Sequence, residues 1–113
     1  MSQVMREEIR TEWQSVHLLI AETLGGYAKI IRSLDDETEW PEIIATAIQA
    51  GLGKDLLAQE LSCAPSTLFR WQFGATKPAR WARLGMKARL IELIDERRAE
   101  ELRAAEQCSA VAA

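Results

Sequence analysis

Residues 54–71 have the sequence K-D-L-L-A-Q-E-L-S-C-A-P-S-T-L-F-R-W, which is the pattern of two short helices joined by a tight turn. Each helix would present one apolar face, because its apolar residues recur at helical spacing. These faces consist of Leu57, Ala58 and Leu61 on the first helix and Leu68 and Trp71 on the second. Pro65 suits the start of the second helix, since a proline at the first helical position loses no hydrogen bond. The stretch therefore predicts an all-α domain organised around this helical pair.

The stretch resembles the helix-turn-helix of the Cro and lambda-repressor-like (XRE-type) regulators. Ala58 matches the family's small residue where the two helices cross, and the buried positions of the family are matched by Leu61, Cys63, Leu68 and Trp71. The resemblance covers residues 41–94. It departs at Ser62, where the family usually has a left-handed glycine, and at Ala64, where serine or threonine would cap the second helix. It implies a lambda-repressor-like helix-turn-helix bundle with added N-terminal helices.

Charge is distributed unevenly along the chain. Its 14 Lys and Arg residues against 17 Asp and Glu residues give a net charge of −3. Between Leu61 and Ile91, however, the sequence contains no acidic residue and six cations. These are Arg70, Lys77, Arg80, Arg83, Lys87 and Arg89. A charge run can merely solvate a helix, but clustered cations that coincide with the second motif helix favour DNA, whose phosphates require them.

Composition excludes several other classes of function. A chain of 113 residues forms one domain with a modest core. Cys63 and Cys108 lie 45 residues apart with no Cys-x-x-Cys pair, which indicates neither a zinc site nor a disulfide framework. His17 has no ligand-forming residue at metal spacing, so we expect no metal, no cofactor and no catalytic residues. With no signal peptide and no apolar run of about 18 residues, the protein is predicted to be cytoplasmic and not a membrane protein.

Residues 1–40 are predicted to form a helical extension. One amphipathic helix would cover residues 3–24, end at Gly25-Gly26, and be followed by a second over residues 27–34. The first helix carries an apolar stripe of Ile9, Trp13, Val16 and Ile20. This stripe could pack on the same molecule or pair two subunits. Its tryptophan favours dimerisation, since large aromatic residues commonly anchor interfaces.

Residues 41–94 are predicted to be the helix-turn-helix DNA-binding domain, and residues 95–113 a polar helical extension with a disordered tail. A last long helix would run from Ala79 to about Gln107. Its core-facing stripe would consist of Trp81, Leu84, Ala88 and Ile91, widened by Leu90, Leu93 and Ile94.

The resemblance implies that the helix over residues 65–73 enters the major groove of DNA. The residues expected to contact bases are Ser66, Thr67, Phe69 and Arg70, and those expected to contact phosphates are Lys54, Lys77 and Arg80. Arg70 is the main candidate for base reading, because a guanidinium can donate two hydrogen bonds to guanine. Phe69 could press on a thymine methyl group or, alternatively, lie in the core.

One such helix contacts only a few base pairs, so the resemblance implies a homodimer on an inverted repeat with half-sites about 34 Å apart. The expected function is that of a transcriptional repressor whose partner is double-stranded DNA. Three alternatives remain open. The chain could be a DNA-targeting module of a transposase or recombinase, an antitoxin that represses its own operon and binds a toxin, or a protein-interaction adaptor.

Overall fold

The computed structural model describes the backbone of residues 3–112 and the side chains of residues 6–108. Every regular element in this range is helical, which confirms the predicted all-α fold. The helices are α1 (Gln3–Ser33), α2 (Trp40–Gln49), α3 (Lys54–Glu60), α4 (Pro65–Gln72) and α5 (Arg80–Ala112). No helix within this range is long and apolar enough to cross a lipid bilayer.

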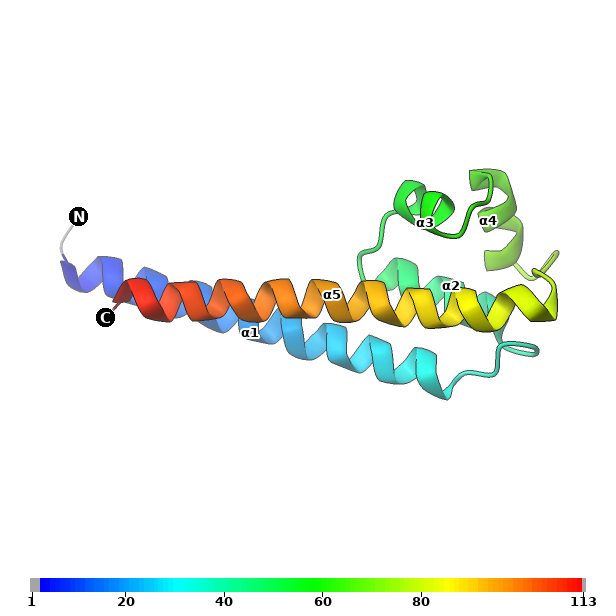
Figure 1. Cartoon of the computed structure of the whole chain (residues 1–113). Coiled ribbons are helices and arrows are strands. Elements are labelled where there is room, and N and C mark those ends of the chain that lie inside the picture. Colours follow the sequence, from blue (N-terminus) through cyan, green and yellow to red (C-terminus); the bar gives the residue numbers. More distant parts are fainter. Residues whose placement is uncertain (1–2, 113) are drawn as a thin grey trace.

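Two parts make up an elongated molecule of 57 × 25 × 18 Å. The long helices α1 and α5 run antiparallel along each other, and α2, α3 and α4 gather at the end far from both termini (Figure 1). We call residues 24–94 the head. The stalk is the remaining pair of helical segments, residues 3–23 and 95–112. The head therefore lies at one end of a two-helix stalk.

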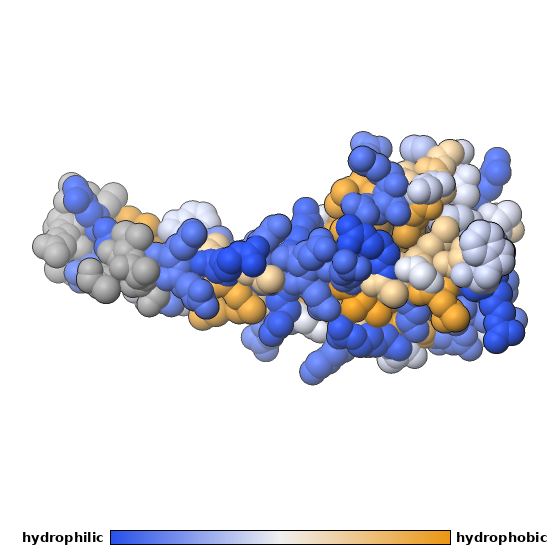
Figure 2. Space-filling model, viewed as in Figure 1, coloured by the Kyte–Doolittle hydropathy of each residue, from blue (hydrophilic) through white to orange (hydrophobic). Residues whose placement is uncertain are grey.

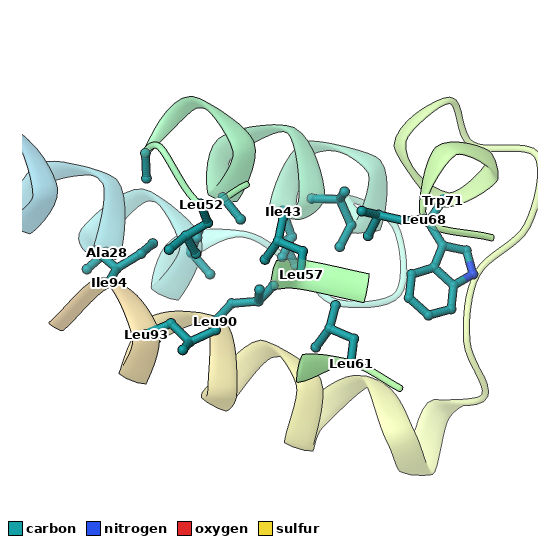
Figure 3. Packing of buried hydrophobic residues seen from close by; sticks show 14 of the residues in the cluster. Ala28, Ile43, Leu52, Leu57, Leu61, Leu68, Trp71, Leu90, Leu93 and Ile94 are labelled. Carbon is teal, nitrogen blue, oxygen red and sulfur yellow. The ribbon is translucent and has the colours of Figure 1, made fainter. Parts of the chain in front are cut away.

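The core of the head draws on all five helices. Ala28 of α1 and Ile94 of α5 lie together at one end of the core, Leu57 of α3 lies between α2 and α5, and Leu68 of α4 lies at the other end (Figure 3). Helix α1 also contributes Leu24 and Ile31. The predicted boundary at residue 41 is therefore wrong for this core, because the second half of α1 is an integral part of it rather than an added extension.

The predicted break at Gly25-Gly26 is also wrong, since α1 continues through both glycines. Its buried residues Ala21, Leu24 and Ala28 lie on either side of them. Each glycine costs a helix about 1 kcal/mol relative to alanine, but burying a large apolar side chain returns about 1.5–3 kcal/mol. Packing against α5 thus outweighs the local preference of the glycines to end a helix.

Helix α5 turns a different face to the core from the one predicted. Trp81 is 86% exposed and Leu84 is also exposed. The buried face contains Leu90, Leu93 and Ile94, which were predicted only to widen the stripe. In the first turns of α5 the side turned to the protein carries buried Arg83 and half-buried Met86, so Trp81 and Leu84 face solvent.

The predicted disordered tail is wrong for residues 108–112, which continue α5; Ala113 lies outside the described residues. Stalk contacts explain the longer helix. Ala105 is buried, and His17 Nδ1 lies 2.6 Å from Glu101 Oε2 across the stalk. His17 is therefore half-buried and paired with α5.

Candidate nucleic-acid interface

The turn between α3 and α4 has the geometry that the resemblance implies. Ser62 has a left-handed backbone with φ of 53°, at the position where the family uses glycine. The N–H of Cys63 donates to the carbonyl oxygen of Ala58 over 2.9 Å, which closes the turn. Ala58 is buried, so the two helices approach closely at a small side chain. Ala64 occupies the N-cap of α4 and offers no side-chain hydrogen bond.

Replacing Ser62 with glycine is expected to stabilise the protein by about 1 kcal/mol. Relief of the left-handed strain gains about 1–3 kcal/mol, and the greater freedom of glycine in the unfolded chain offsets about 0.5–1 kcal/mol. Urea unfolding followed by circular dichroism measures the change. The matched control, Ser66→Gly inside α4, should destabilise by about 0.5–1 kcal/mol. Equal effects of the two substitutions would contradict the role assigned to the left-handed backbone.

The inner face of α4 is anchored in the head. Leu68 and Trp71 point into the core (Figure 3) and are buried. The ring of Trp71 meets that of Trp40 edge to face, with centroids 6.0 Å apart and an interplanar angle of 76°. At the end of the helix, Gly74 takes a φ of +76° and the N–H of Ala75 donates to the carbonyl oxygen of Arg70. The position of α4 is thus fixed by its buried face and by the turn after its C-terminus.

The outer face of α4 is open to solvent. Pro65, Ser66 and Arg70 are exposed, and Thr67 is half-buried. Phe69 is 57% exposed, so the alternative that it lies in the core is wrong. It stacks on exposed Phe73 with ring centroids 4.6 Å apart. Phe73 was not predicted as a surface residue, although its spacing of four from Phe69 places both on one helical face.

Three of the six cations between Leu61 and Ile91 bind acceptors within the protein. Arg83 is buried, with Nε 3.1 Å from Asp36 Oδ2. Lys87 Nζ donates to the carbonyl oxygen of Leu34, the residue directly after α1. Arg89 Nε lies 2.9 Å from Glu60 Oε2, and this hydrogen bond raises the pKa of Arg89 further above its already high value. These three cations stabilise the fold and cannot be counted toward a DNA-facing charge.

The predicted site cations are exposed. Lys54 begins α3, Arg70 lies on α4, and Lys77 and Arg80 follow α4 in the chain. Among the described side chains, none of the four forms an ion pair with a carboxylate. Lys77 Nζ donates to the backbone carbonyl oxygen of Glu37 over 3.0 Å. The helix-turn-helix therefore carries cations whose charge is not neutralised by a paired carboxylate.

The surface that results combines hydroxyl and guanidinium donors with two exposed aromatic rings. Within residues 6–108, no group of three or more His, Cys, Asp or Glu side chains could hold a metal ion. Comparisons with protein-family models, curated proteins and solved structures found no match.

Proposed function

We propose that this protein is a sequence-specific DNA-binding transcriptional repressor that acts as a homodimer. One observation carries the proposal. Helix α4 is fixed from behind by Leu68 and Trp71, while its front exposes Ser66, Phe69 and Arg70. A short helix held rigidly with a polar, cationic front is the arrangement that reads base edges in the major groove.

In this proposal α4 enters the major groove with its N-terminus first. Arg70 donates two hydrogen bonds to O6 and N7 of a guanine, a contact worth about 1–3 kcal/mol of discrimination against other bases. The Ser66 hydroxyl can donate to or accept from a base edge, and Phe69 can pack on a thymine methyl group. Thr67 is half-buried, which restricts it to contacts at the edge of the site.

Lys54, Lys77 and Arg80 would bind backbone phosphates on either side of the groove. Such contacts fix the position of the protein on the duplex without reading sequence. They also release counterions, so the logarithm of the binding constant falls with the logarithm of salt concentration, with a slope of about −0.9 for each phosphate contact. Salt dependence therefore separates these residues from Arg70.

Replacing Arg70 with alanine is expected to weaken binding to the preferred site by about 5- to 150-fold, which corresponds to the loss of one bidentate base contact. A preferred site is first obtained by selecting bound sequences from a random DNA pool. Fluorescence anisotropy on that duplex and on a scrambled one then gives both affinities. Discrimination between the two duplexes should fall, because Arg70 reads a base rather than the backbone.

The matched control is Arg103→Ala, which removes an exposed arginine from the stalk and should leave affinity unchanged. Lys77→Ala should weaken both duplexes equally and reduce the salt slope by about one. Selection that enriches no sequence, or an Arg70→Ala protein that binds like the wild type, would overturn the proposal.

A second candidate is an antitoxin that represses its own operon and also binds a toxin. The observation that favours it is the exposure of three aromatic residues: Phe69 in α4, Phe73 directly after α4, and Trp81 at the start of α5. Aromatic residues are enriched in protein interfaces, where they supply most of the binding energy. If Trp81→Ala abolishes copurification of a small partner while DNA binding persists, this second role is supported.

A further inference from the structure

The outer face of α4 continues into a second aromatic ring, Phe73, to which the proposed function gives no role. Phe73 directly follows α4, and its N–H donates to the carbonyl oxygen of Phe69 over 3.2 Å, so it continues the last turn of the helix. It lies seven residues after Ser66, which places it about 10 Å further along the helix and within about 20° of Ser66 around it. Phe73 therefore belongs to the same outward face as the residues proposed to read bases.

Phe69 and Phe73 form one apolar surface, which we call the phenyl pair. Their ring centroids lie 4.6 Å apart with an interplanar angle of 52°, within the range in which aromatic rings attract each other. The contact covers little of either ring, since Phe69 is 57% and Phe73 is 67% exposed. Gly74 fixes the backbone after Phe73, because its left-handed conformation lets its N–H donate to the carbonyl oxygen of Trp71. The phenyl pair is thus held in place with its outer surface open to a ligand.

The charge around the phenyl pair distinguishes it from the exposed apolar stripe of the stalk. Ser66 and exposed Arg70 share its face, and α4 contains no carboxylate. The residues predicted for dimerisation are also between 37% and 57% exposed, and they are Ile9, Trp13, Val16 and Ile20. Glu12 lies three residues after Ile9 and four before Val16, so it adds a negative charge beside that stripe. In the view of Figure 2, apolar surface is concentrated on the head, while the stalk is mainly hydrophilic. Of the two surfaces, only the phenyl pair suits a polyanion.

We infer that the phenyl pair reads the methyl groups of two neighbouring thymines in each half-site. The inference deepens the proposed function and rests on it. In the major groove, adenine, guanine and cytosine present only hydrogen-bonding groups, and among the four bases thymine alone presents a methyl group. A phenyl ring forms no hydrogen bond with a base edge, so packing it on a polar edge removes water from that edge without replacing its hydrogen bonds. Thymine is therefore the base that the phenyl pair selects.

The spacing of the two rings suits two bases rather than one. Successive bases of one strand are about 3.4 Å apart along the duplex axis and are rotated by about 36°, since about ten base pairs make one turn. The methyl groups of neighbouring thymines are therefore somewhat more than 3.4 Å apart, close to the 4.6 Å between the ring centroids. Phe69 contacts one thymine and Phe73 the next. Because Arg70 adjoins Phe69 in the chain, the guanine that it reads should lie within the same few base pairs.

Deoxyuridine tests the inference, because it is thymidine without the methyl group. Each thymine of the site selected from the random pool is replaced in turn, and fluorescence anisotropy measures the affinity of the wild-type protein for each duplex. At two neighbouring positions of a half-site, each replacement should lower the affinity by about 4-fold, the effect of exposing one buried methyl group.

Substitutions then assign each methyl group to one ring. Phe69→Ala should lose the preference for thymine over uracil at one of the two positions, and Phe73→Ala should lose it at the other. Trp81→Ala is the matched control, since it removes an exposed aromatic ring from α5 and should keep both preferences. A merely structural defect would weaken binding to both duplexes equally, so the ratio of the two affinities isolates contact with the methyl group.

The inference is overturned if no thymine methyl group affects the affinity of the wild type, or if Phe69→Ala and Phe73→Ala keep both preferences. When a selected site depends on Arg70 but not on methyl groups, the proposed function stands and only the role of the phenyl pair falls. A random pool that enriches no sequence overturns the proposed function and this inference with it.

Discussion

Replacing Trp40 with alanine is expected to lower the free energy of unfolding by about 3–5 kcal/mol. Trp40 is the first residue of α2, is fully buried, and supports the ring of Trp71 from α4. Its removal would leave a cavity directly behind the helix proposed to enter DNA. Because single domains are stable by only about 5–15 kcal/mol, much of the total would be lost. Urea unfolding followed by far-ultraviolet circular dichroism measures the change without relying on tryptophan fluorescence.

Trp40→Phe is the matched control for this prediction. The indole N–H of Trp40 is buried and has no hydrogen-bond partner among the described residues. A buried donor without a partner costs about 1–3 kcal/mol, and phenylalanine removes that donor while keeping most of the apolar ring. We therefore expect a loss below about 1.5 kcal/mol, in the range of tolerated apolar substitutions. A loss as large as that of Trp40→Ala would show that the N–H has a partner or that ring shape dominates.

The helix-turn-helix could be predicted because its signals are local. The beginning of α4 follows from Pro65, and the turn before it from the interruption of the apolar pattern at Ser62, Cys63 and Ala64. The left-handed backbone of Ser62 could be anticipated only through the resemblance, since serine itself disfavours that conformation. The open face of α4 then follows from the two residues, Leu68 and Trp71, that hold the opposite face.

The burial of α1 could not be predicted in the same way. Its larger apolar stripe, which contains Trp13 and Val16, is exposed, and its packing face uses the small residues Ala21 and Ala28. Small side chains let two helices approach closely, so α5 packs there although the other stripe is more hydrophobic. The choice depends on a helix that begins at Arg80, and no signal within α1 reveals it.

The stretch between Leu61 and Ile91 presents less positive charge to solvent than its six cations suggest, for a related reason. A count of cations along the sequence cannot tell which of them finds an acceptor in a distant segment. Lys87 reaches the end of α1, Arg89 reaches Glu60 of α3, and Arg83 reaches Asp36 in the turn before α2. Each of these contacts joins residues at least 29 positions apart. Three of the six cations therefore form ion pairs or hydrogen bonds that join α5 to earlier segments of the chain.

Replacing Asp36 with alanine tests the ion pair between Asp36 and Arg83. We expect it to destabilise the protein by about 3 kcal/mol, near the lower end of the range for breaking a buried ion pair. Arg83 is only 4% exposed, and its guanidinium donates to Asp36 Oδ2 over 3.1 Å and to the carbonyl oxygen of Pro78 over 2.9 Å. Without the carboxylate, a buried positive charge would keep only a neutral acceptor. Thermal and urea unfolding measure the loss.

Replacing the other partner of the ion pair, Arg83→Met, should lower the free energy of unfolding by less, about 1 kcal/mol. Asp36 is partly exposed, so water can solvate its carboxylate when Arg83 is absent. The double variant Asp36→Ala/Arg83→Met should regain about 1 kcal/mol of the stability lost in Asp36→Ala, which corresponds to a coupling energy of about 2 kcal/mol in the double-mutant cycle. Arg83→Met should also leave the salt slope of DNA binding unchanged, since a buried guanidinium releases no counterion from phosphate. Additive losses in the cycle would instead mean that the ion pair between Arg83 and Asp36 contributes little to the stability of the fold. A reduced salt slope would mean that Arg83 belongs to the cations that contact DNA.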